Sequence, residues 1–144
     1  MRISFWLAVS AYLVPTFPLG YFWHLVTVAD QYHRLAMYRD DVIIPIGLAS
    51  MVIQALFFAW VYPKLFASDR TPWVRGALTF GCIFGIFAWS FAVLPVAAKY
   101  RMSSVQDFLL LETTFTLIQF AIVSPLIALA YRMGASKSTP VAMA

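Results

Sequence analysis

Two histidines and a small number of carboxylates are the residues of this chain that could do chemistry. Asp30 and His33 are three residues apart, so they would share one face of a helical turn. Together with His24, Glu112 and Trp89 they form a candidate polar or ligand site. Histidine and carboxylate side chains are the types that bind metals and transfer protons, which makes this set the first place to look for function.

A metal held by His24, His33 and Glu112 is one interpretation, although the spacing matches no established ligand pattern. A hydrogen bond between His24 and Glu112, or a solvated Glu112 at a membrane interface, are the alternatives. Haem bound by both histidines is disfavoured, because adjacent segments of one hairpin can hardly reach opposite faces of one ring. We therefore predict no catalytic residue and no cofactor.

The composition excludes several classes of protein. Of the 144 residues, 62% are apolar and only 11% are charged, whereas soluble domains are about a quarter charged. The single cysteine, Cys82, cannot form a disulfide within the chain and excludes a dithiol redox centre. The net charge of +4 is not gathered on a soluble basic face, so we expect no nucleic-acid partner.

Four apolar stretches are long enough to cross a bilayer, which requires about 20 helical residues. They cover residues 3–29, 42–62, 76–98 and 108–131. Glu112 is the only charged residue within their interiors. The sequence predicts an all-α fold, an integral membrane four-helix bundle in one domain over residues 1–134 with a short polar tail at 135–144.

The distribution of basic residues predicts the orientation of this bundle. Four spans place both termini on one side, which then carries six lysines and arginines against four on the other side. The six are Arg2, Lys64, Arg70, Arg75, Arg132 and Lys137. Because basic residues near span ends favour the cytoplasm, we expect cytoplasmic N- and C-termini in a cell (inner) membrane. The loops at 30–41 and 99–107 would then face outward.

Small residues and amides are expected to hold the helices together, because helix association in lipid depends on close backbone approach and polar contacts. Gly81 and Gly85 lie on one stripe of the third span and should pack against another helix. We favour packing within the chain over packing between chains. Gln54 and Gln119 each lie about eleven residues into their spans, so both should be buried at the same depth and bridge helices.

Prolines predict that the helices are kinked. Pro15 and Pro18 should break the middle of the first span, while Pro95 and Pro125 should bend the third and fourth. The carbonyl groups freed in the first span need donors, which Gln54 and Gln119 could supply. Whether these polar groups only join helices or also line a cavity stays open.

Three strings of residues carry a resemblance: Phe17-Pro-Leu-Gly-Tyr-Phe-Trp-His24, Arg75-Gly-Ala-Leu-Thr-Phe-Gly81 leading to Trp89, and Tyr62-Pro63 at the end of the second span. In this layout the chain resembles small bacterial four-span membrane proteins catalogued as a domain of unknown function. The resemblance implies a multi-pass bacterial membrane protein. It carries no activity.

Three classes of function fit these features. The first is a non-catalytic accessory bundle that binds a lipid or another apolar small molecule, or a larger membrane protein or a second copy. The second is a small proton-coupled transporter with Glu112 as its ion site. The third is a metal- or haem-binding membrane enzyme that uses His24, His33 and Glu112. We favour the first, with the lipid bilayer as its surroundings.

Overall fold

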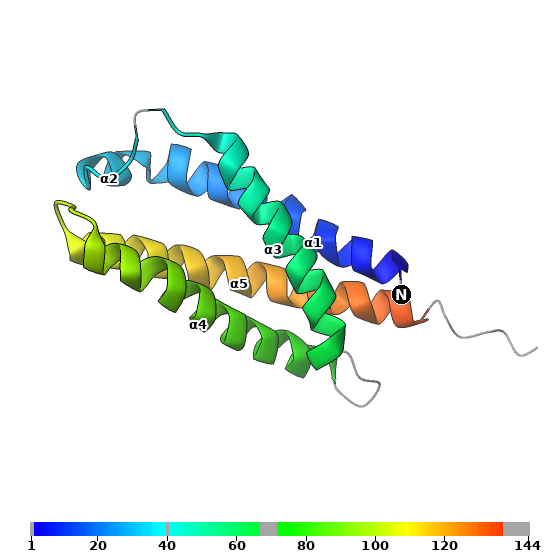
Figure 1. Cartoon of the computed structure of the whole chain (residues 1–144). Helices are drawn as coiled ribbons and strands as arrows, with labels where there is room; N and C mark the ends of the chain where they lie inside the picture. The colour runs from blue at the N-terminus through cyan, green and yellow to red at the C-terminus, as the bar shows by residue number, and fades with distance from the viewer. Residues whose placement is uncertain (1, 40, 67–71, 137–144) are drawn as a thin grey trace, which may run out of the picture.

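The computed structural model describes residues 2–39, 41–66 and 72–136 (Figure 1). Their elements are α1 (Arg2–Phe22), a π-helical turn η1 (Trp23–Thr27), α2 (Ala29–Arg34), α3 (Ile44–Leu65), α4 (Trp73–Lys99) and α5 (Val105–Ser136). No strand occurs in these ranges, so the predicted all-α class is confirmed. Arg70 and Lys137, which entered the prediction of orientation, lie outside the described residues.

Four helices are long and apolar enough to cross a membrane, as the sequence predicts. Their bounds are Ile3–Thr27, Ile44–Leu65, Trp73–Lys99 and Val105–Gly134. The start of α1 and the end of α5 lie at one end of the molecule, which we call the terminal end (Figure 1). The opposite end carries α2 and the connection between α4 and α5, and we call it the α2 end.

Helix α5 is the centre of the arrangement, because it packs along both α4 and α1, while α3 lies across α1 (Figure 1). The glycines of α4 permit the close contact with α5. A Cβ atom at Gly81 would lie 2.8 Å from Ser124 Oγ, and one at Gly85 would lie 3.4 Å from the ring of Phe120. Both glycines therefore pack within the chain, against α5.

An aromatic core fills the space between α3, α4 and α1. Phe58 of α3 packs edge-on against Phe80 and Phe84 of α4 and against Tyr12 of α1. Tyr62, one turn further along α3, stacks on Tyr131 of α5, whose hydroxyl donates to the carbonyl oxygen of Ala59. The second half of α3 is thus fixed to the other helices at the terminal end.

The first half of α3 is exposed rather than packed against the other helices. Residues 44–50 are all exposed, and the buried residues of α3 begin only at Ala55. The helix therefore diverges from its neighbours toward the α2 end. This divergence opens one side of α1 and has consequences for the site described below.

The first helix remains α-helical through both of its prolines, Pro15 and Pro18. The departure from α-helical hydrogen bonding comes later, at η1, where the N–H of Val28 donates to the carbonyl oxygen of Trp23 over 3.1 Å. A single π-helical turn of this kind rotates the side chains that follow it and often marks a functional position. Here it carries His24.

Candidate functional site

The α2 end holds a cluster of four polar side chains, Tyr32, Glu112, Tyr38 and His24, which we call the tyrosine–glutamate–histidine cluster. Tyr32 donates a hydrogen bond of 2.6 Å to Glu112 Oε1. The hydroxyl of Tyr38 lies 2.9 Å from His24 Nδ1, and the two tyrosine rings stack with centroids 4.6 Å apart. The cluster joins η1, α2, the following loop and α5 through side chains.

His24 Nδ1 and Glu112 Oε1 are 4.0 Å apart, which is too far for a hydrogen bond. The direct His24–Glu112 hydrogen bond considered from the sequence is therefore not formed. Each partner instead bonds to a tyrosine hydroxyl, and both side chains are about four-fifths buried, at 22% and 18% exposure. Two tyrosine hydroxyls can thus satisfy the hydrogen-bonding needs of a mostly buried imidazole and carboxylate without a buried ion pair.

Local backbone structure places the two tyrosines. Tyr32 is fully buried on the short helix α2, and Leu35 beside it packs with Val93 and Phe108. Ala36 adopts a positive φ of 56°, which turns the chain back toward the bundle and brings Tyr38 over His24. Ser103, in the other loop at this end, donates its hydroxyl to the carbonyl oxygen of Arg34 and thereby ties the two loops together.

Burial raises the pKa of Tyr32 and of Tyr38 well above the ordinary tyrosine value. The nearby Glu112 carboxylate adds to the shift, because a second negative charge beside it is unfavourable. Both phenols therefore stay protonated at neutral pH and keep their O–H groups available to Glu112 and His24.

The remaining members of the predicted polar site lie apart from this cluster. Asp30 and His33 are exposed on α2, and their side chains make no hydrogen bond or ion pair with His24 or Glu112 in the described structure. The prediction that they join one site with His24 and Glu112 is wrong, because the residues buried here are Tyr32 of α2 and Leu35, which directly follows the helix. Trp89 donates its indole N–H to Thr113, the residue after Glu112, over 2.8 Å.

No group of three or more histidine, cysteine, aspartate or glutamate side chains suited to a metal ion occurs within the described residues. His33 is exposed on α2, and the three candidate ligands His24, His33 and Glu112 do not form such a group.

A second polar group lies deeper in the bundle, around the hydroxyl of Tyr12. Tyr12 is fully buried; it donates to Gln54 Oε1 and accepts a hydrogen bond of 3.0 Å from Gln119 Nε2. The two amides thus lie at the same depth and are bridged by a tyrosine of the first helix. The prediction that both are buried is wrong for Gln54, which is exposed because α3 diverges from the bundle there; Gln119 is half-buried.

The divergence of α3 forms a groove between α1 and α3, with a volume of about 750 Å³, which we call the α1–α3 groove. Its walls are mainly apolar. Polar side chains line it at two depths: Gln54 and Gln119 in its deep part, and His24, Tyr38 and Arg39 at the α2 end. The volume falls in the range of about 300–1,000 Å³ that is typical of small-molecule sites.

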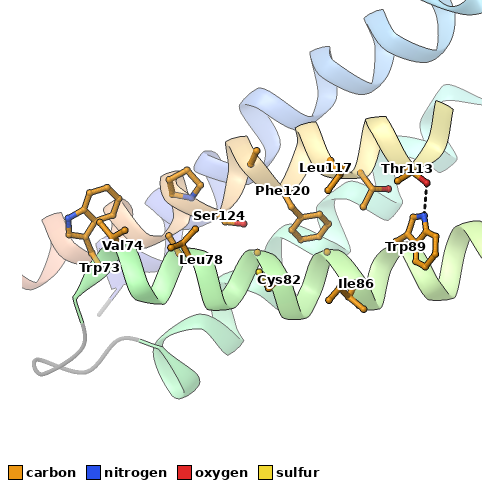
Figure 2. A pocket seen from close by; sticks show the side chains of 16 residues that line it. Trp73, Val74, Leu78, Cys82, Ile86, Trp89, Thr113, Leu117, Phe120 and Ser124 are labelled. Carbon is orange, nitrogen blue, oxygen red and sulfur yellow. Dashed lines mark hydrogen bonds between the residues drawn. The ribbon is translucent and has the colours of Figure 1, made fainter. Parts of the chain in front are cut away.

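A second groove follows the contact between α4 and α5, with a volume of about 620 Å³ (Figure 2). It runs from Trp73 at one end to Trp89 at the other, and the ring of Phe120 forms part of its floor. Its lining is almost entirely apolar, and the hydroxyl of Ser124 is buried between the helices without a hydrogen-bond partner in the described structure. This α4–α5 groove lacks the polar side chains of the first.

No protein-family model matches the chain, and comparisons with curated proteins and with solved structures also give no match. The inference about function therefore depends on the geometry alone.

Three tyrosines are the residues that sequence reasoning missed. Tyr12, Tyr32 and Tyr38 are not among the site residues that the sequence predicts. One signal was present for Tyr12: a tyrosine in an apolar segment needs a partner for its hydroxyl, and Gln54 and Gln119 are the partners within reach.

Proposed function

We propose that this chain is a multi-pass protein of a bacterial inner membrane with both termini in the cytoplasm. The four apolar helices support the membrane location. The start of α1 and the end of α5 lie at one end of the molecule (Figure 1), which supports a shared side, and the excess of lysine and arginine in the sequence segments expected on that side supports the cytoplasm. Pro15, Pro18, Pro95 and Pro125 within three of the helices support kinks.

We further propose that the protein is a non-catalytic bundle that holds an amphiphilic molecule of the membrane in the α1–α3 groove. The observation that carries this proposal is the combination of apolar walls with His24, Gln54 and Gln119 on one continuous surface. A purely apolar tail needs no such side chains, whereas a lipid with a polar head gains hydrogen bonds from them.

We propose binding without a reaction because His24, which lines the groove, has no hydrogen-bonded carboxylate within the described residues to orient it as a base, and Glu112 does not reach the groove. Glu112 and Tyr32 bond to each other and neither lines the groove, and Tyr12 occupies the oxygen of Gln54. A catalytic base or nucleophile would have to reach the bound molecule.

The test is retention of lipid by the purified full-length protein, measured by native mass spectrometry after release from nanodiscs. Gly47 lines the groove, and an added Cβ there meets no atom within 4 Å. Gly47→Phe should therefore fill the groove without disturbing the fold and abolish retained lipid. Ile83→Phe, on an exposed part of α4 outside both grooves, is the matched control and should retain lipid as the wild type does. Equal retention by the two variants would refute the proposal.

A proton-coupled transporter is the second candidate, favoured by the position of Glu112. It is an ionisable side chain within a candidate membrane span, mostly buried and hydrogen-bonded to Tyr32. Glu112→Gln keeps the shape and removes the charge. Proton-driven flux across vesicles that is lost in this variant would support transport, whereas flux that persists, or no flux in the wild type, would exclude this role.

A further inference from the structure

We infer that the α1–α3 groove selects a lipid with an uncharged, hydrogen-bonding head group, of the diacylglycerol type, over anionic phospholipids. The inference rests on the proposed function and specifies the ligand class for the same groove. It follows from the paired charge of Arg39 at the groove mouth and from the unpaired Nε2 of His24 on the groove wall.

The described residues that line the groove present no unpaired cation. Arg39 is the only lysine or arginine among them, and its guanidinium makes two hydrogen bonds to the Asp41 carboxylate, of 3.2 and 3.1 Å. An anionic phosphate at this mouth would meet a guanidinium that is already paired with a carboxylate, so it would gain no unpaired counter-ion there.

The groove does present a free hydrogen-bonding atom, Nε2 of His24. The hydroxyl of Tyr38 is hydrogen-bonded to Nδ1 of His24, whereas Nε2 has no hydrogen-bond partner among the described residues. In either tautomer Nε2 can make one hydrogen bond, as a donor when Tyr38 donates to Nδ1 and as an acceptor otherwise.

These features suit a head group made of hydroxyl and ester carbonyl groups. A hydroxyl can donate or accept, so it can pair with His24 Nε2 in both tautomers. The acyl chains would follow the apolar walls formed by residues such as Phe17, Ile43 and Met51. The head group needs no charge to bind in this way. A charged head group would lose its hydration without gaining an unpaired counter-ion from the protein.

The experiment measures competition between two lipids of equal chain length. Full-length protein in nanodiscs containing equal amounts of dioleoylglycerol and dioleoylphosphatidylglycerol is released and analysed by native mass spectrometry. The wild type should retain the uncharged lipid in preference by about tenfold, which corresponds to about 1.4 kcal/mol.

Asp41→Asn is the informative variant, because it releases the Arg39 guanidinium toward the groove mouth. We expect the preference to shift toward the anionic lipid by at least about fivefold. Asp107→Asn is the matched control: it changes the net charge equally, but Asp107 is exposed at the start of α5 and does not line the groove. This variant should keep the wild-type preference.

Each outcome has a distinct meaning. Retention of neither lipid by the wild type would overturn the proposed function itself. Retention of both lipids equally, or a preference for the anionic lipid in the wild type, would leave lipid binding intact and overturn the inference about the head group. An equal shift in Asp41→Asn and Asp107→Asn would also overturn it, because the effect would then reflect net charge alone.

Discussion

The hydroxyl of Tyr32 donates a 2.6 Å hydrogen bond to Oε1 of Glu112, across 80 residues of sequence. This bond joins the short helix α2 to the central helix α5. Tyr32 is fully buried. The Glu112 carboxylate makes no other side-chain hydrogen bond within the described residues, so no second donor would take the place of the Tyr32 hydroxyl.

Tyr32→Phe removes this donor and keeps the ring. We expect a loss of about 1–3 kcal/mol in the free energy of unfolding, because a buried charged acceptor loses its partner. Thermal unfolding in detergent measures the effect. Tyr100→Phe, at a residue that is 62% exposed, should change stability by less than about 0.5 kcal/mol. Equal losses for the two variants would show that Glu112 does not depend on Tyr32.

Tyr38→Phe should alter how stability depends on pH. Burial, with a contribution from Glu112, raises the pKa of Tyr38 above its unfolded value of 10.0. The folded protein then holds the phenolic proton more tightly than the unfolded chain does, so stability is complete below pH 10 and falls as the pH rises above it. The decline from pH 9 to pH 11 should be shallower in Tyr38→Phe than in the wild type. Parallel curves would contradict the buried position of this phenol.

Gly81→Ala should destabilise the contact between α4 and α5. The new Cβ would approach Ser124 Oγ to 2.8 Å, and overpacking of this kind costs about 1–3 kcal/mol. Gly47→Ala is the matched control, since nothing lies within 4 Å of a Cβ there and alanine favours a helix by up to about 1 kcal/mol. Unfolding in detergent should therefore separate the two variants in opposite directions. A neutral Gly81→Ala would mean that the helices do not meet at this glycine.

The bridge from Tyr12 to Gln119 can be measured with a double-mutant cycle. Tyr12→Phe and Gln119→Leu each remove one side of the 3.0 Å hydrogen bond. The coupling energy should be about 0.5–1.5 kcal/mol, as for other polar contacts between membrane helices. If the losses in free energy of unfolding of the two single variants add up to that of the double variant within error, the two side chains are not in contact.

The all-helical class and the four apolar helices were predictable because helix length and apolar composition follow directly from the physics of a bilayer. The packing of Gly81 and Gly85 against another helix also follows from spacing alone. The contact partner on α5 does not, because several helices could fill such a surface.

The candidate site was only partly predictable. Depth along the spans placed His24 near Glu112 and Gln54 level with Gln119. The depth of a residue in its span does not reveal which way its side chain points around the helix axis. The π-helical turn at Trp23–Thr27 and the turn at Ala36 decide which side chains face inward. These local features brought Tyr32 and Tyr38 to Glu112 and His24, and left His33 and Asp30 exposed.

The exposure of Gln54 has the same kind of cause. A single helix pattern does not specify how far α3 diverges from α1, because that depends on aromatic packing at the other end of the helix, around Phe58 and Tyr62. The groove is a product of the whole arrangement.

Photocrosslinking can locate the bound lipid on the protein. A diacylglycerol that carries a diazirine in one acyl chain is incorporated into nanodiscs with the wild-type protein, irradiated, and mapped by peptide mass spectrometry. If the lipid occupies the α1–α3 groove, adducts should concentrate on groove residues of α1 and α3, such as Phe17, Gly47 and Met51, with few on Ile83. Adducts spread evenly over all exposed apolar residues, or confined to the α4–α5 groove, would contradict it.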